Sequence, residues 1–523
     1  MKNGVQIYDT TLRDGTQSEG VSFSKTDKIR IAEKLDAFGI AYIEGGWPGS
    51  NPKDRDFFEE MKSRPLKQAK LTAFGSTCRV KGRVEDDKNL QLLVEAETPV
   101  ITIFGKSWLL HVHDVLKTTP ERNLEIVGDS VGYLAGYGRE VIFDAEHFFD
   151  GYVDSPEYAL DVLRRSAEAG ASSVVLCDTN GGMLPHDIAR ITEVVRAALP
   201  EDVVVGIHCH NDTECAVASS LAAIRAGATH VQGTVNGIGE RCGNANLCSI
   251  IPALEMKMDL RCLQDADALT RLCELSRFVD DHANMRGDDH RPYVGQSAFA
   301  HKGGMHVNAV SKNATTFEHV KPESVGNRRR ILISDLSGGS NILLKAEEHD
   351  IDLNGKGDDV RQILVELKNL EAEGYEFESA DASFSLLVEK LMHKHQPLFH
   401  LEGFRVIVEK RGPEDPSLSE ATIKLRVNDQ TELMAAEGTG PVHALDLALR
   451  KALIRFFPEV ADMHLRDYKV RILDGEGGTA VKTRVLIESG DGKDIWSTVG
   501  VSENIIEASW EALVDSVEYF LIR

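Results

Sequence analysis

The chain has 523 residues, of which 42% are hydrophobic and 27% are charged, which is the composition of an ordinary soluble globular protein. Its 59 basic and 83 acidic residues give a formal net charge of −24, which argues against nucleic acid and anionic membranes as partners. An anionic small molecule is still compatible with this charge, because an acidic protein can carry a local basic pocket. The length predicts two or three domains.

Membrane and secretion signals are not visible in the sequence. No apolar run approaches the ~20 residues that a membrane-spanning helix needs. The first residues, Met1–Gly4, lead directly into a strand-like run and lack the layout of a signal peptide. The eight cysteines are scattered without CxxC pairs, which is typical of free thiols in a reducing compartment. We therefore expect a cytoplasmic protein with no membrane partner.

The first half of the chain, from Val5 to about Met258, alternates short apolar runs with longer amphipathic ones. Helix signals include Ser24, an N-cap before a helix that runs to Phe38, and a proline in the first turn of Pro156–Ala169 and of Pro185–Leu199. Eight strand–helix units in about 260 residues predict an α/β fold, the (β/α)8 or TIM barrel. The predicted strands are Val5–Asp9, Ala41–Gly45, Lys70–Ser76, Val100–Phe104, Glu140–Ala145, Ser173–Cys177, Val203–His208 and His230–Thr234.

A doubly wound open sheet is the alternative to the barrel. Such a sheet usually carries a glycine-rich phosphate loop after its first strand, and here that place is taken by Thr11–Gly15. Polar residues also follow most of the predicted strands, and in a barrel these strand ends meet at one mouth, where active sites are built. This convergence favours an enzyme. The polar residues are Arg13, Asp14, Glu44, Glu146, Asp178, Thr179, His208, His210 and Asn236.

Two of these strand ends together offer a possible metal site. Asp14 follows the first predicted strand, and His208 and His210 end the seventh. The two histidines are two residues apart, so on a strand both rings point to the same face. One carboxylate and two imidazoles suit a divalent metal with open positions, and Arg13 beside the carboxylate suits an oxyanion or a keto acid. The plain alternative is two hydrogen-bonded core histidines and an Asp-Gly turn.

Beyond the barrel the chain changes character twice. Residues 261–399 alternate helical stretches with irregular loops, and we interpret them as a linker with small helical subdomains. Within them, Arg328–Arg330 would either meet coenzyme A phosphates or form a solvated turn. Residues 400–523 contain an internal repeat of two βββα units without an obvious catalytic cluster, which favours a regulatory or dimerising domain. The predicted elements are Arg405–Glu409, Ala421–Val427, Gln430–Ala436 and helix Pro441–Phe456, then Lys469–Leu473, Ala480–Ile487, Lys493–Val501 and helix Asn504–Leu521.

Three longer segments carry a resemblance to a known family. They read DTTLRDGTQSEGVSFS (9–24), HCHNDTECAVA (208–218) and VNGIGERCGNANL (235–247). They resemble the DRE-TIM metallolyases, in particular the branch of isopropylmalate, homocitrate and citramalate synthases. The resemblance covers essentially the whole chain, and residues 400–523 resemble the allosteric domain of isopropylmalate synthases. The segment IEGGWPGSNPKD (43–54) is most similar to the citramalate synthase group.

The resemblance implies a role for individual residues. A divalent metal (Mn, Mg, Co or Zn) would be bound by Asp14, His208 and His210, with Asn244 supporting the site or completing the coordination sphere. Arg13 would stabilise the keto oxygen as it becomes an alkoxide, Thr179 would hold the keto-acid carboxylate, and Glu146 would contact the reacting groups. His306 is similar to the proposed general base of the family and would reach the active site of a neighbouring subunit.

Five further residues are interpreted one by one, and for Glu44 and Asp9 two roles stay open. The family commonly has a tyrosine where this chain has Phe317, which cannot donate a hydrogen bond. Glu44 would either take part in the site or only brace the barrel mouth. Asp9 would orient Arg13 or bind the metal. His111 and His113, on a predicted helix, are interpreted as surface groups.

The resemblance implies a synthase that condenses acetyl-CoA with pyruvate to citramalate and coenzyme A, in isoleucine biosynthesis. We expect a homodimer, with isoleucine as the feedback ligand bound near the turns Gly438–Gly440 and Gly475–Gly478. The close alternative is a 2-isopropylmalate or homocitrate synthase, because an extra methylene in an apolar pocket is worth only ~1–3 kcal/mol. A lyase that runs the reverse cleavage would lack the long C-terminal region. A metabolite-binding regulator with an inactive barrel is the alternative from another class.

Overall fold

The computed structural model describes residues 4–265, 267–334, 336–349, 351–353, 355–473 and 481–523. The chain divides into two units. The first ends at Phe299 and also includes Val320–Arg328, and the second comprises Ala300–His319 and Arg329–Arg523. The three domains predicted from the sequence, 1–260, 261–399 and 400–523, stay predictions.

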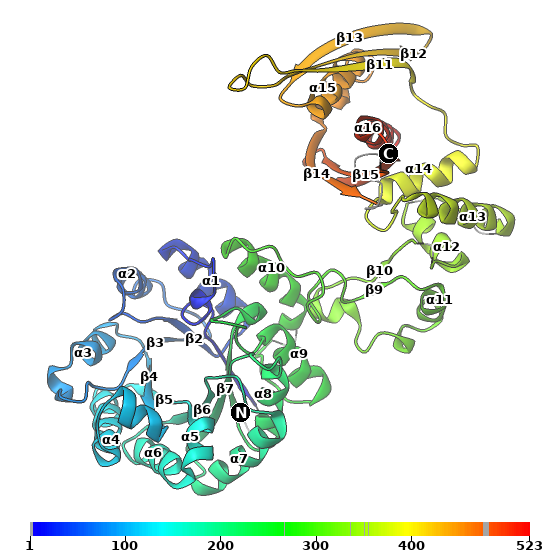
Figure 1. Cartoon of the computed structure of the whole chain (residues 1–523). Helices are drawn as coiled ribbons and strands as arrows, with labels where there is room; N and C mark the ends of the chain where they lie inside the picture. The colour runs from blue at the N-terminus through cyan, green and yellow to red at the C-terminus, as the bar shows by residue number, and fades with distance from the viewer. Residues whose placement is uncertain (1–3, 266, 335, 350, 354, 474–480) are drawn as a thin grey trace. The chain divides into compact units, whose positions relative to one another are not determined.

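Eight parallel strands close into a barrel in the first unit, and the last strand pairs with the first (Figure 1). The closed barrel confirms the predicted fold class and rules out the doubly wound open sheet. Each strand begins within one residue of its predicted start, because the buried apolar runs of a parallel sheet are plain in the sequence. The strands are β1 Gln6–Asp9, β2 Tyr42–Gly46, β3 Lys70–Ser76, β4 Val100–Lys106, β5 Glu140–Glu146, β6 Ser173–Asp178, β7 Val204–Cys209 and β8 His230–Gly233.

Helices surround this barrel, and several begin where the sequence predicts. Ser24 caps the first helix through a capping box with Asp27, and Gly39 ends it in the left-handed conformation at φ 100°. Pro156 and Pro185 start two others at the first helical position. The helices are α1 Lys25–Phe38, α2 Pro52–Met61, α3 Lys88–Glu95, α4 Pro120–Gly136, α5 Phe148–Asp154, α6 Pro156–Glu168, α7 Pro185–Ala198, α8 Ala216–Arg225, α9 Leu247–Lys257 and α10 Leu272–His282.

Two apolar layers hold the barrel together. One lies between the strands and the helices and contains fully buried side chains such as Phe23, Phe57 and Phe143. Each of these side chains contributes about 1.5–3 kcal/mol by leaving water. The other is a smaller cluster of barrel residues that includes Tyr8 and Tyr42. Together they fix the strand ends, and therefore the polar residues that follow them.

The second unit begins with small elements and three packed helices. A two-stranded parallel sheet joins β9 Ala300–His301 to β10 Arg330–Ile331. A separate apolar cluster, which includes Ile342, Leu367 and Phe384, unites the helices. The packed helices are α12 Gly339–Glu348, α13 Gly357–Glu373 and α14 Asp381–Leu391, and α11 Gly304–Lys312 precedes them in the chain.

The βββα repeat forms two three-stranded antiparallel sheets, each followed by a helix (Figure 1). Residues of both repeats share one core, so the repeats form one α+β domain as predicted. Of the predicted features, Ala480 and the turn Gly475–Gly478 lie outside the described residues. The elements are β11 His400–Glu409, β12 Leu418–Val427, β13 Gln430–Gly438 and α15 Pro441–Leu453, then β14 His464–Ile472, β15 Thr483–Gly490, β16 Ile495–Ser502 and α16 Ile505–Ile522.

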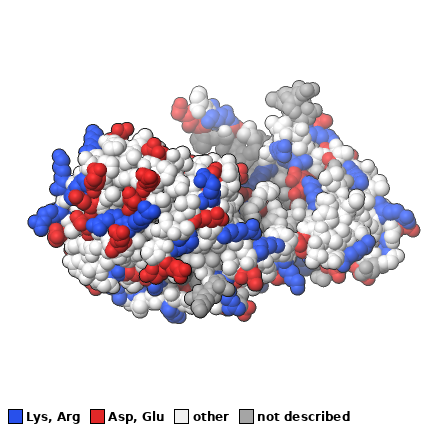
Figure 2. Space-filling model, turned by 90° about the horizontal axis from the view of Figure 1, so that it is seen from below, with Lys and Arg blue, Asp and Glu red and all other residues white. Residues whose placement is uncertain are grey.

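The distribution of surface charges and the state of the cysteines can be compared with the expectations drawn from the composition. On the face that Figure 2 shows, acidic and basic side chains are interspersed rather than gathered by sign. Within the described residues, no helix has the length and apolar character that crossing a membrane would require. All eight cysteines lie in the described ranges, and all are free thiols.

Candidate active site

A cavity of about 210 Å³ lies in the barrel unit and collects six of the residues predicted from the sequence. They come from the ends of four strands that are far apart in the chain: β1, β5, β6 and β7. Parallel strands present their carboxyl ends at the same rim, which explains why these residues meet. The six residues are Arg13, Asp14, Glu146, Thr179, His208 and His210.

Asp14, His208 and His210 offer ligand atoms that lie within 4.8 Å of one another, and all three side chains are buried. The Asp14 Oδ2 atom is 3.4 Å from His208 Nε2 and 4.0 Å from His210 Nε2. Asn244 lies beside them, because its backbone forms an antiparallel bridge with His210. The structure therefore brings together the four residues expected to hold a metal.

The electrostatics of this cluster suit a cation. Burial lowers the pKa of His208, and burial together with the neighbouring His208 lowers the pKa of His210 to about 4, so both rings are neutral near pH 7. Burial opposes ionisation of Asp14, but Arg13 and then the two imidazoles hold the pKa of its carboxyl below the ordinary value. Neutral imidazoles and an ionised carboxylate are the protonation states that a metal requires.

Two buried polar atoms without a hydrogen bond are a further sign that the cluster fits a divalent cation. Asp14 Oδ1 and Asn244 Oδ1 are buried and accept no hydrogen bond from the described residues. Buried oxygen atoms are normally paired, so two orphaned acceptors at one place need an explanation. A divalent cation in this cluster would satisfy both, and the residues present fit one.

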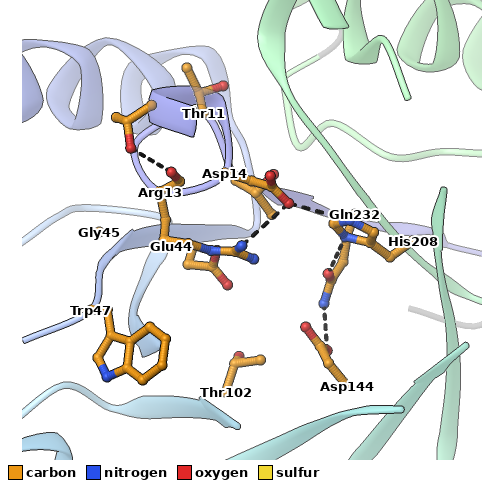
Figure 3. A network of polar contacts seen from close by, with 12 residues as sticks. Thr11, Arg13, Asp14, Glu44, Gly45, Trp47, Thr102, Asp144, His208 and Gln232 are labelled. Atoms are coloured by element: carbon orange, nitrogen blue, oxygen red, sulfur yellow. Dashed lines mark hydrogen bonds and ion pairs between the residues drawn. The ribbon is translucent and has the colours of Figure 1, made fainter. Parts of the chain in front are cut away.

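Arg13 is held on three sides, and Figure 3 shows two of its neighbours, Glu44 and Asp14. Its Nε donates to Glu44 Oε1 at 2.5 Å, its Nη1 lies 3.3 Å from Asp14 Oδ2, and its guanidinium carbon lies 3.8 Å above the Phe74 ring. Burial opposes the charge, but Glu44 and then Asp14 raise the pKa of Arg13, so it is a permanent cation. Glu44, whose other oxygen accepts from the Tyr8 hydroxyl at 2.5 Å, is a brace rather than a cavity residue.

The hydrogen bonds of Asp9 bear on the two roles considered for it, orienting Arg13 or binding the metal. Its carboxylate accepts from Thr11 N at 3.0 Å and from Thr11 Oγ1 at 2.8 Å. Thr11 in turn accepts from Val235 N at 2.9 Å, which ties the first loop to the loop after β8. Asp9 therefore shapes the loop that carries Arg13 and Asp14, which favours an indirect orienting role over direct metal binding.

Thr179 and Glu146 also line the cavity. The Thr179 Oγ1 atom accepts from His147 N at 2.9 Å, so its own hydroxyl proton can be donated to a ligand. Glu146 forms an ion pair with Lys106, the last residue of β4. His111, expected at the surface, is instead partly buried against His147, with ring centroids 4.4 Å apart.

His306 belongs to the second unit, and its side chain is exposed on α11. Its ring contacts Phe317, with centroids 4.3 Å apart and an interplanar angle of 32°. In this chain the residue at the position of the family tyrosine therefore packs against the imidazole as an apolar surface. In the basic run Arg328–Arg330, Arg329 is paired with Glu318 at 2.5 and 2.6 Å, which favours a structural role for that arginine.

Sequence reasoning missed several residues of the cavity. Trp47, Phe74 and Phe104 form an aromatic wall, in which Trp47 meets both phenylalanines edge-on. Gln232 and Asp144 form hydrogen bonds behind His208. Aromatic residues at strand ends look like core residues in a sequence, so only Trp47, within a segment already singled out, gave a usable signal.

Three family models match consecutive parts of the chain. The HMGL-like model matches residues 4–279, a "Homocitrate synthase post-HMGL domain-like" model matches 293–375, and the LeuA allosteric (dimerisation) domain matches 378–521. The chain belongs to the HMGL-like family. The match spans the barrel and both segments of the metal cluster, so the resemblance inferred from the sequence is confirmed.

Within the HMGL-like family, relatives differ in how similar they are to this chain. Several proteins named (R)-citramalate synthase are 45% to 55% identical to it, and that of Geobacter sulfurreducens is 55% identical over 99% of this chain and 97% of its own length. A putative (R)-citramalate synthase of Methanopyrus kandleri is 31% identical over 99% of this chain and 97% of its own. A probable 2-isopropylmalate synthase of Methanopyrus kandleri is 33% identical over 99% of this chain and 98% of its own. A solved HMG-CoA lyase from Brucella melitensis is 20% identical with a TM-score of 0.46, covering 54% of this chain and 99% of its own.

Two substitutions in this HMGL-like barrel separate charge stabilisation from metal binding. We expect Arg13→Lys to keep the bound metal and lose most turnover, because lysine cannot reproduce the planar donors that contact Glu44 and Asp14. Asp14→Ala should lose both metal and turnover. Metal content measured by mass spectrometry and initial rates of purified variants test this, and normal turnover of Arg13→Lys would make that residue structural.

Proposed function

We propose that this protein is a citramalate synthase, an acyltransferase that condenses acetyl-CoA with pyruvate and water to give (R)-citramalate and coenzyme A. The observation that carries the proposal is full-length identity of up to 55% to proteins of that name, in a chain whose barrel mouth holds Arg13, Asp14, His208 and His210 together. The intact cluster argues against a regulator with an inactive barrel.

The cavity supplies binding and charge stabilisation for the keto acid. A divalent metal bound by Asp14, His208 and His210 would polarise the keto carbonyl. The Thr179 hydroxyl, whose oxygen already accepts from His147, donates to the keto-acid carboxylate. Arg13 lies in the same cavity and stabilises the negative charge that develops on the keto oxygen, with its plane fixed in advance by Glu44 and Phe74.

Carbon–carbon bond formation needs a base that removes a proton from the acetyl methyl group. His306 is the proposed base, because an imidazole can accept a proton near neutral pH. The carbanion equivalent attacks the keto carbon, and water then cleaves the thioester and releases coenzyme A. Glu146, held by Lys106 in the cavity lining, contacts the reacting groups and is the second candidate for the proton.

The proposed reaction and its alternatives differ in the size of the keto-acid substrate. The aromatic wall of Trp47, Phe74 and Phe104 bounds the cavity of about 210 Å³. Large, closely packed rings leave less room for a branched keto-acid side chain than for a methyl group. The wall and the lower identity to the 2-isopropylmalate synthase both favour pyruvate over larger keto acids.

The C-terminal domain supports a homodimer with feedback control. Residues 378–521 match the LeuA allosteric (dimerisation) domain, and no predicted catalytic residue lies there. For a citramalate synthase the pathway end product is isoleucine, which is the proposed feedback ligand. The free thiols fit a protein that works in the cytoplasm.

A keto-acid panel tests the proposed function. With acetyl-CoA and a divalent metal, we expect coenzyme A release, read with a thiol reagent, to be fastest with pyruvate. One added methylene costs about 1–3 kcal/mol in a closed apolar pocket, so 2-oxobutyrate should react about 10- to 200-fold more slowly by kcat/KM. The Asp14→Ala protein is the blank. A preference for 2-oxoisovalerate or 2-oxoglutarate would contradict the proposal.

The role of His306 is tested by proton exchange. We expect His306→Ala to bind metal and pyruvate normally but to exchange the acetyl methyl protons with solvent deuterium at least about 100-fold more slowly, the scale of general-base catalysis. Mass spectrometry of recovered acetyl-CoA measures the exchange. Unchanged exchange would transfer the role to Glu146, whose Gln variant is the comparison.

Isoleucine binding tests the regulatory role of the C-terminal domain. Calorimetry of the intact protein should show saturable binding of isoleucine, and the same concentrations should inhibit coenzyme A release. Inhibition requires a coupling free energy of about 1–3 kcal/mol between the two sites. Leucine is the matched control ligand. Absence of binding by isoleucine would contradict feedback control by this amino acid.

A further inference from the structure

A chain of buried hydrogen bonds runs behind His208, on the side away from Asp14 (Figure 3). It links His208 on β7 to Gln232 on β8 and then to Asp144 on β5. The side chains are almost completely buried, with exposed fractions of 5% for His208, 0% for Gln232 and 4% for Asp144. These bonds are therefore shielded from exchange with solvent.

The bond between His208 and Gln232 fixes where the imidazole carries its proton. The two residues are paired partners on adjacent strands, and His208 Nδ1 lies 2.8 Å from Gln232 Oε1. An amide oxygen can only accept, so Nδ1 must be the protonated nitrogen. In a neutral ring Nε2 then has a free lone pair, and this is the atom that lies 3.4 Å from Asp14 Oδ2.

Asp144 fixes the amide that accepts this proton. Gln232 Nε2 donates to Asp144 Oδ1 at 2.9 Å, and in this orientation the amide oxygen faces His208. If the amide were reversed, its NH2 group would face Nδ1 and favour the opposite tautomer, which would protonate Nε2 and prevent metal binding. The second imidazole has no such support among the described residues, because His210 Nδ1 is buried without a hydrogen-bond partner.

We propose that Gln232, oriented by Asp144, is a positioning residue that holds His208 in the Nδ1-protonated tautomer and presents its Nε2 lone pair to a divalent metal. The proposal rests on the metal-dependent function proposed above. Hydrogen-bond partners of metal-bound histidines typically change metal affinity by about 10- to 100-fold.

Three variants of the full-length protein measure the effect on affinity. Gln232→Leu removes the acceptor and should weaken binding of Co²⁺, followed by its visible absorption, by about 10- to 100-fold. Gln232→Glu keeps an acceptor but places two carboxyls together, so its affinity should be intermediate. Adding Asp144→Asn to Gln232→Glu restores both hydrogen bonds with their roles exchanged, because the amide introduced at position 144 donates to the carboxylate introduced at position 232. This double variant should recover Co²⁺ affinity to within about threefold of the original.

The matched control is Thr72→Val, another buried substitution in the barrel. The Thr72 hydroxyl is buried and has no hydrogen-bond partner among the described residues, so its removal should leave Co²⁺ affinity unchanged. Circular dichroism and thermal melting establish that each variant is folded. A loss of affinity in Thr72→Val equal to that in Gln232→Leu would overturn the proposal, since both changes would then act through the fold.

The tautomer can be read without any metal. In metal-free protein labelled with 15N-histidine, long-range proton–nitrogen spectra should show His208, assigned from its absence in His208→Ala, protonated at Nδ1. Gln232→Leu should lose this pattern, and the double variant should regain it. The proposal is overturned if the tautomer is the same in Gln232→Leu, or if that variant binds Co²⁺ within twofold of the original. Failure of the proposed function would instead appear as a keto-acid panel without coenzyme A release, while the tautomer is unaffected.

Discussion

The contact between Arg13 and Asp14 is the interaction on which the rest of the barrel mouth depends. Asp14 is buried and Arg13 is largely so, with 3% and 15% of their side chains exposed, and removing charges from water costs several kcal/mol per ion unless each is well paired. Arg13 is paired with Glu44 as well as Asp14, and Glu44 is paired with Tyr8. The site therefore carries two carboxylates around one guanidinium, an excess of negative charge that a divalent cation beside the imidazoles would offset.

The barrel topology stabilises this arrangement of charged groups. Arg13 and Asp14 lie in the turn directly after β1, Glu44 lies in β2, and His208 lies in β7. Because β1 pairs with both β2 and β8, and β8 pairs with β7, these strands are consecutive around the closed sheet. Glu44 and His208 are held by strands of the packed barrel, and the turn that carries Arg13 and Asp14 is fixed by the hydrogen bonds of Thr11 to Asp9 and Val235. This is the preorganisation that charge stabilisation in catalysis requires.

The sequence predicts the strands of the barrel and the groups that follow them better than it predicts their partners. Strand starts and the His208–His210 pair depend on local patterns of two to eight residues, and the structure places them as expected. The bond from Gln232 to Asp144 joins β8 to β5 across the barrel, and no local pattern encodes it.

Two histidines inside the barrel, His208 and His230, show that surroundings, not residue type, decide what an imidazole does. His230 begins β8, is fully buried and has neither ring nitrogen hydrogen-bonded to the described residues. Burial lowers its pKa to about 3, and its ring packs 5.3 Å from Tyr8 and 5.6 Å from Tyr42. It is a neutral aromatic group of the apolar layer, whereas His208 has a partner on one nitrogen and a carboxylate facing the other. A metal-binding histidine is recognised by this difference between its two ring nitrogens. In His208 the difference arises because the neighbouring strand β8 places Gln232 behind the ring.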